Sequence, residues 1–164
     1  MIGAVAFLAF LVAQRLGELA LARRNTARLM ARGAVEHGAA HYPAIVALHA
    51  AWIGALAWWG WDQPVHLGWL AAFAVLQALR LWVLVTLGER WTTRIVVSSE
   101  PLVARGPFRL VPHPNYLVVM AEIAVAPMVL GLPWVALAFF ALNAALLLLV
   151  RIPAEDRALA PLRR

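Results

Sequence analysis

Long apolar runs constrain this chain more than any other feature of its sequence. Hydrophobic residues make up 64% of it and the mean hydropathy is +0.80, whereas an average soluble domain is about 45–50% apolar. Several of the runs approach or exceed the roughly 18 residues that are typical of a transmembrane helix. We therefore predict an all-α integral membrane protein with about five transmembrane helices, at residues 2–22, 42–61, 66–88, 116–130 and 134–150.

The last two predicted spans divide one continuous apolar stretch, residues 116–150. At about 1.5 Å per residue this stretch is too long for a single crossing. Gly131 favours a turn and Pro133 favours a helix start, so we predict a helical hairpin. No repeat or low-complexity linker interrupts the sequence, which indicates a single membrane-embedded domain over residues 1–164.

The basic residues predict the orientation in the membrane. All fourteen are arginines, and the twelve outside the predicted spans follow the first, third and last spans, whereas residues 62–65 and 131–133 contain none. The positive-inside rule then places the N-terminus outside and the long loops and C-terminus in the cytoplasm. Arginine usage without lysine suggests a GC-rich bacterial gene, hence a bacterial inner membrane. Because the arginines follow the membrane and form no separate patch, membrane lipids are expected partners and nucleic acid is not.

Four charged residues fall inside the predicted spans, all in the cytoplasmic half: Arg15, Glu18, Arg80 and Glu122. A charge at the centre of a span costs about 2.5–3.5 kcal/mol, so each needs a partner or water. Their charges sum to zero, which favours pairing across helices around a polar cavity, with Asn143 at a similar depth. Alternatively, Arg15 pairs with Glu18 on its own helix and Arg80 snorkels to the interface.

Two polar segments carry most of the chemistry. Residues 102–116 read LVARGPFRLVPHPNY, in which three prolines prevent a regular helix, and residues 151–159 read RIPAEDRAL. The pair resembles the isoprenylcysteine carboxyl methyltransferase family, whose members carry LVxxGPYRxxRHPxY before a helical hairpin and RxxxEExxL after it. This resemblance implies a membrane enzyme that uses S-adenosylmethionine and releases S-adenosylhomocysteine. It also implies that both segments fold over the cofactor at the cytoplasmic face, mainly within residues 102–164, while a lipid-like acceptor enters from the bilayer.

The same resemblance implies roles for individual residues. Pro112 stands where the family has Arg, which leaves Arg109 as a substitute, and Asp156 stands where the family has its second Glu. Arg151 and Glu155 match the arginine and first glutamate of the tail and become catalytic candidates, together with the membrane-buried Glu122. The cofactor-binding candidates are Leu102, Val103, Gly106, Phe108, His113, Pro114, Asn115, Tyr116 and Glu155.

The acceptor is either a carboxylate or a hydroxyl. Residues 14–25 and 35–43 resemble a bacterial branch of the family that O-methylates alkylresorcinols or alkylpyrones, whereas a prenylcysteine-like carboxylate is the alternative. A carboxylate needs only a cation such as Arg151, whereas a phenol with a pKa near 10 needs a base. Glu36, Glu18 and Glu122 and the loop histidines are the base candidates. The substrate-binding candidates are Glu18, Asn25, His37, His41, Trp91 and Asn143.

Three other interpretations are weaker. His37 and His41 are four residues apart and His49 lies two turns further on, a spacing that could bind zinc. Pro43 interrupts any continuous helix and no carboxylate or thiolate completes the set, so we predict no metal. NADPH-dependent membrane lipid reductases share the HPNY sequence, but this chain is short and shows no second polar region for a dinucleotide. A non-enzymatic small membrane protein would leave Glu122 and His113 unexplained. The sequence gives no signal for an oligomeric state.

Overall fold

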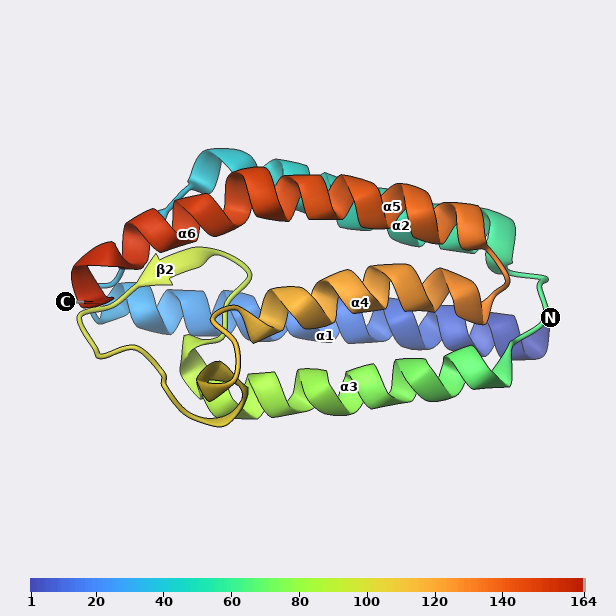
Figure 1. The fold of residues 1–164 in the computed structure, drawn as a ribbon, viewed down its shortest axis with the longest axis horizontal. Helices are drawn as coiled ribbons and strands as arrows, with labels where there is room; N and C mark the ends of the chain where they lie inside the picture. The colour runs from blue at the N-terminus through green and yellow to red at the C-terminus, as the bar shows by residue number, and fades with distance from the viewer. Residues whose placement is uncertain (164) are drawn as a thin grey trace.

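The computed structural model describes residues 1–163, most of which lie in helices that run side by side along one axis (Figure 1). The long helices are joined by short turns at one end and by longer, partly extended loops at the other. The helices are α1 (Ile2–Ala31), α2 (Tyr42–Gly60), α3 (Leu67–Leu87), α4 (Pro114–Val129), α5 (Pro133–Leu146) and α6 (Ile152–Leu159). The strands are β1 (Val35–His37) and β2 (Ile95–Val97).

The helices have the length and surface of an integral membrane protein. Four of them are long and apolar enough to cross a bilayer: α1, α2, α3 and the helix that starts with α5. Helix α4 has 16 residues, or about 24 Å at helical rise, and is therefore shorter than the roughly 30 Å hydrocarbon core. Large apolar side chains cover the outside of the bundle; Trp58 is 76% exposed and Leu137 is 72% exposed. Water would oppose such exposure, whereas lipid does not.

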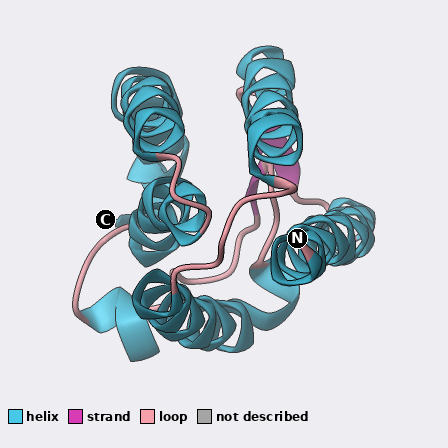
Figure 2. Cartoon of the chain, turned by 90° about the vertical axis from the view of Figure 1, so that its right-hand side faces the viewer, coloured by secondary structure: helices cyan, strands magenta, loops and turns pink. Residues whose placement is uncertain are grey.

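The two ends of the bundle differ in content. The N-terminus lies at one end, and the strands, α6 and the C-terminus lie at the other (Figure 1). Viewed along the bundle from the N-terminal end, the helices are seen end-on and the strands lie behind them (Figure 2). The arginine-free turns predicted from the sequence are therefore separated from the arginine-rich loops by the length of the helices.

The turn between α4 and α5 shows how the sequence sets these boundaries. Gly131 has φ 67°, a left-handed conformation that glycine adopts without steric cost. The Leu132 amide donates to the Pro127 carbonyl at 3.0 Å, which closes the end of α4, and Pro133 begins α5 because a first-turn residue needs no amide donor. The hairpin forms as the Gly-Leu-Pro sequence predicts.

Three features differ from the sequence prediction. First, the helical fold, which agrees with the predicted all-α class, also contains a short ribbon in which β1 pairs antiparallel with β2, with Glu36 opposite Val96. Second, α1 continues to Ala31 instead of ending at residue 22. Third, α5 passes through a π-helical segment, Leu147–Arg151, directly into α6. The C-terminal segment is therefore a continuation of the last long helix.

The apolar core lies mainly in the half of the bundle that contains the N-terminus. Buried side chains of α1, α2, α4 and α5 pack there, including Leu11, Trp52, Ile123 and Val135. A second, smaller cluster around Ala22 and Trp91 supports the loop end. The space between these two clusters is where the polar side chains gather.

Candidate active site

The hydroxyl of Tyr116 joins the two segments that the sequence analysis singled out. Tyr116 lies in the first turn of α4, and its hydroxyl donates to a carboxylate oxygen of Glu155 on α6. The Arg151 Nε donates to the same hydroxyl at 3.0 Å. Arg151 and Glu155, which are 35 and 39 positions from Tyr116 in the chain, thus both bond to its hydroxyl oxygen.

Arg151 is held by groups from two further parts of the chain. Its Nη2 donates to the Thr93 carbonyl at 2.9 Å, and its Nη1 lies 3.5 Å from His41 Nε2. The guanidinium is buried, with 5% of the residue exposed. Arg151 is the last residue of the π-helical segment, which carries one extra residue per turn and so re-aims the side chains that follow it. The guanidinium is therefore fixed in direction before any ligand binds.

His113 and Asp156 form a second contact between the same two segments. His113 precedes α4, and its Nε2 lies 3.2 Å from Asp156 Oδ1. The imidazole also stacks on the Tyr116 ring, with centroids 5.5 Å apart and planes at 26°. Asp156, which replaces the family's second Glu, therefore contacts the His113 segment directly.

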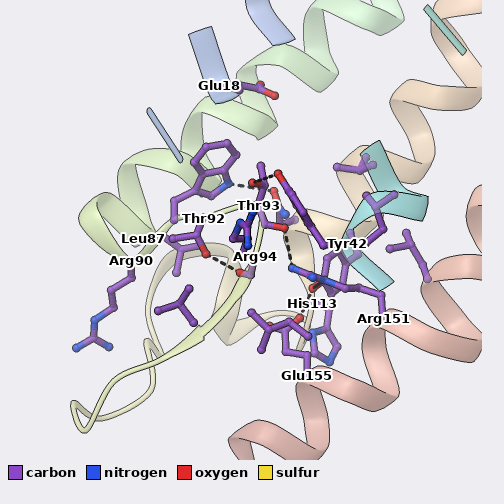
Figure 3. Close-up of a pocket in the computed structure, with 18 of the residues that line it drawn as sticks. Glu18, Tyr42, Leu87, Arg90, Thr92, Thr93, Arg94, His113, Arg151 and Glu155 are labelled. Carbon is purple, nitrogen blue, oxygen red and sulfur yellow. Dashed lines mark hydrogen bonds between the residues drawn. The ribbon is translucent and has the colours of Figure 1, made fainter. Parts of the chain in front are cut away.

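The β1–β2 ribbon closes the site on its third side. Arg94 lies over the Tyr42 ring at 4.4 Å and donates to Glu36 at 2.7 Å. The Tyr42 hydroxyl lies 3.0 Å from the Thr93 hydroxyl. Figure 3 shows Tyr42, Thr93 and Arg151 converging from different elements on one region. The ribbon therefore links α2 to the loop whose Thr93 carbonyl accepts a hydrogen bond from Arg151.

Most of these residues line a cavity of about 480 Å³; His41, Asp156 and Glu36 lie outside its wall. Its polar end is formed by the other residues just described, together with Leu102, Val103 and Leu159. Its other end lies between α1 and α2, where apolar side chains form the wall. Two of these, Leu16 and Val46, are 61% and 42% exposed on the bundle surface. The cavity therefore runs from the loop end of the molecule to a lipid-facing gap between α1 and α2.

A network of buried charges borders this cavity and joins α1, α3 and α4: Arg15, Glu18 and Arg80 line the cavity, and Glu122 lies behind them. Glu122 is fully buried and accepts from Arg15 at 2.7 Å, from Gln77 at 2.9 Å and from Arg80 Nε at 2.7 Å. Arg15 also pairs with Glu18 at 2.9 Å, and Arg80 pairs with Glu18 at 3.2 Å. The four charged residues thus pair across helices. Arg80 does not snorkel, since only 3% of it is exposed.

The structure places the predicted site residues in two groups. Those in the cavity wall are Leu102, Val103, Phe108, His113, Asn115, Tyr116, Arg151, Glu155, Glu18 and Trp91. Gly106 lies next to Thr86 and Trp82, where a Cβ atom would come within 2.7 Å of the Thr86 hydroxyl, so this glycine sets the packing of the loop. Pro114 is buried at the first turn of α4.

The remaining candidates lie outside the wall. Asn25 donates to the main-chain carbonyls of Trp91 and Gly88 and so anchors the loop after α3. Glu122 lies behind the wall in the charge network, and His37 is exposed on β1. The Asn143 amide nitrogen is buried without a partner, so Asn143 does not join the network through it. His41 reaches the site only through its contact with Arg151.

Two cavity residues, Tyr42 and His49, were not predicted as catalytic, cofactor-binding or substrate-binding residues. Tyr42 follows the predicted substrate-binding residue His41 directly, but its cation–π contact with Arg94 forms only in the folded chain. His49, which the sequence analysis considered only as a zinc ligand, lies in the cavity wall within α2. Arg109, the proposed substitute for the arginine lost at Pro112, is exposed and lies outside the wall, whereas Pro112 lies in it.

A helical membrane protein with a cavity that connects a polar loop site to the lipid is suited to an enzyme that joins a water-soluble and a lipid-soluble substrate. Comparison with known proteins agrees with this class. Residues 69–161 match the isoprenylcysteine carboxyl methyltransferase (ICMT) family, and the chain therefore belongs to that family. It is also 38% identical over 165 residues to the uncharacterized protein YpbQ of Bacillus subtilis (strain 168), covering 93% of this chain and 94% of that protein. No solved structure matches it.

Proposed function

We propose that this protein transfers the methyl group of S-adenosylmethionine to the hydroxyl of a lipid-like acceptor, with both sites in the cavity. Family membership supports a membrane methyltransferase. The observation that carries the proposal furthest is the bond of Tyr116 to both Glu155 and Arg151 at the polar end of a cavity whose other end faces lipid.

The polar end has the chemistry that the cofactor requires. Glu155 and Tyr116 offer acceptors for ribose hydroxyls or an ammonium group, and Arg151 offers a cation for a carboxylate. Leu102, Val103 and other apolar side chains in the same wall provide a surface for adenine. When bound, S-adenosylmethionine supplies an electrophilic methyl group, and the residues of this chain orient it and exclude water.

The apolar end fits a long hydrocarbon chain that enters between α1 and α2. The exposed positions of Leu16 and Val46 in the cavity wall mark the proposed lipid entrance. An acceptor anchored there would present its polar head towards the loop end, where the cofactor site lies. Alkylresorcinols and alkylpyrones, the acceptors of the bacterial branch that the N-terminal half resembles, have this shape. The orientation that suits the cofactor places the loop end in the cytoplasm of a bacterial cell.

Isothermal titration of the detergent-purified protein with S-adenosylhomocysteine and with NADPH tests the cofactor class. We expect binding of S-adenosylhomocysteine only. The substitutions His113→Ala and Glu155→Ala should abolish it, because each removes one side of the contact between the loop and α6. Binding of NADPH alone would contradict the proposal, as would wild-type affinity in both variants.

A further inference from the structure

His49 has one ring nitrogen that is directed by the protein and one that is not. It lies in α2 about two turns beyond Tyr42, and its Nδ1 is 2.9 Å from the Ile45 carbonyl oxygen. A carbonyl can only accept, so Nδ1 carries the proton and Nε2 of the neutral ring keeps its lone pair. Among the described residues no side chain or main-chain group bonds to Nε2, and it is not one of the enclosed atoms without a partner. Nε2 therefore faces the cavity that His49 lines.

The carboxylates of the cavity wall are already engaged. Glu18 accepts from Gln14 at 3.0 Å through one oxygen and from Arg15 at 2.9 Å through the other. Glu155 accepts the Tyr116 proton, and Glu100 pairs with Arg90. A carboxylate held in an ion pair is a weak proton acceptor, because protonation would leave its cation unpaired.

The cations of the wall are matched in the same way. Arg15 and Arg80, the arginines at the membrane end, both pair with Glu122, whereas Arg151 lies at the polar end, where it is the cation proposed for the cofactor carboxylate. A carboxylate acceptor at the membrane end would therefore find no unpaired cation, and an uncompensated charge in a low-dielectric site is costly. A neutral hydroxyl carries no such penalty. The paired arginines of the wall are Arg15, Arg80, Arg90 and Arg94.

We propose that His49 Nε2 is the general base for a neutral hydroxyl acceptor, and that the acceptor is therefore a phenol or enol and not a carboxylate. This inference rests on the proposed function and names its acceptor class. In the step, the acceptor oxygen forms a bond to the methyl carbon while the carbon–sulfur bond breaks and sulfur keeps the electron pair. The hydroxyl proton passes to Nε2, so that the products are a methyl ether, a neutral thioether and an imidazolium.

The charged network surrounds this imidazole from the other helices. The charges of Arg15 of α1, Arg80 of α3 and Glu122 of α4 act on the ring, and Glu18 of α1 pairs with both arginines. Two carboxylates balance two guanidiniums there. The imidazolium formed in the step is the only added charge at this end, and its proton can return to bulk water once the product leaves.

The test compares His49→Gln with His66→Gln in proteoliposomes that contain 5-pentadecylresorcinol. His66 precedes α3 at the opposite end of the bundle, outside the cavity, so it is a matched control. At pH 7 we expect His49→Gln to lose about 100-fold or more in methyl transfer. The loss should shrink towards pH 10, where a phenol with a pKa near 10 ionises by itself. A loss smaller than threefold at pH 7, or one that is equal at every pH, would overturn the proposal.

Two further measurements separate this inference from the proposed function. Titration with S-adenosylhomocysteine should give the same affinity in wild type and His49→Gln; no binding in wild type would mean that the proposed function itself fails. In ¹⁵N-histidine spectra we expect the Nδ1-protonated form of His49 and a shift of its Nε2 signal when the resorcinol is added with S-adenosylhomocysteine. An unshifted signal overturns the inference, and so does wild-type transfer to N-acetyl-S-farnesylcysteine that matches or exceeds transfer to the resorcinol.

Discussion

At the scale of single residues, the Tyr116 hydroxyl connects the loop segment before α4 with the C-terminal segment that carries Arg151 and Glu155. It donates to Glu155 while it accepts from Arg151, and so bridges the two charged side chains. Removal of this one oxygen leaves a buried guanidinium with one bond fewer and a carboxylate without its donor. Hydrogen bonds to charged groups contribute about 1.5–3 kcal/mol each.

We therefore expect Tyr116→Phe to weaken S-adenosylhomocysteine binding by about tenfold or more, since 1.4 kcal/mol corresponds to a factor of ten. Tyr42→Phe is the matched control, because the Tyr42 hydroxyl bonds the Thr93 hydroxyl and not the Thr93 carbonyl that holds Arg151. Titration calorimetry on both variants measures the difference. Equal affinities would show that the Tyr116 hydroxyl does not organise the site.

Glu122 is the residue on which the buried network depends most. It is fully buried and accepts from Arg15, Gln77 and Arg80. Glu122→Gln removes the charge that both guanidiniums share, and loss of one partner from a buried ion pair costs about 3–5 kcal/mol. We expect a clearly lower melting temperature in detergent. Glu89→Gln, which removes the partner of the exposed Arg28 and Arg32, should leave the melting temperature almost unchanged.

Among residues, the sequence predicted those whose neighbours are set by a local motif. His113, Tyr116, Arg151 and Glu155 follow fixed spacings on either side of the helical hairpin, and all four line the cavity. Residues whose surroundings depend on helix rotation were harder to place. Nothing in the sequence shows that Glu122 points behind the cavity wall.

At the scale of elements, the π-helical segment Leu147–Arg151 sets the position of α6. Each residue of an α-helix turns the chain by about 100°, so an added or missing residue rotates everything after it. The segment therefore decides whether Arg151 and Glu155 face Tyr116.

Deletion of Leu149 should rotate Arg151 and Glu155 away from Tyr116 and abolish S-adenosylhomocysteine binding. The side chain of Leu149 is 76% exposed, so the deletion removes no core contact. Leu149→Ala is the control and should bind normally. We expect both proteins to melt within a few degrees of wild type, which separates loss of the site from loss of the fold. Retained binding in the deletion variant would show that the segment has no positioning role.

Helix limits were predictable where proline or glycine marks them. Helix α2 begins at Tyr42 beside Pro43, and α5 begins at Pro133 after the Gly131 turn. The β1–β2 ribbon was not predictable, because each strand has three residues and its partner lies far along the chain. The start of the π-helical segment was not predictable either, because Leu147–Val150 continues the apolar sequence of the helix before it.

At the scale of the whole molecule, the separation of arginine-free and arginine-rich ends predicts a defined orientation in the membrane. The chain contains no cysteine, so single cysteines report position without background. We expect Asp62→Cys to react with a membrane-impermeant maleimide on intact spheroplasts and Ser99→Cys to react only after lysis; both positions are exposed. The reverse pattern would invert the proposed topology and place the cofactor site outside the cytoplasm.

The gap between α1 and α2 also determines which acceptor concentration sets the reaction rate. If the acceptor reaches the cavity from the bilayer, the rate follows the mole fraction of acceptor among the lipids and not the amount per volume of suspension. Dilution of the vesicles with buffer would then leave the initial rate per protein unchanged, whereas added phospholipid would lower it. A methyl ether has lost its hydroxyl donor and returns to hydrocarbon more readily than the parent lipid, so the membrane itself draws the product away.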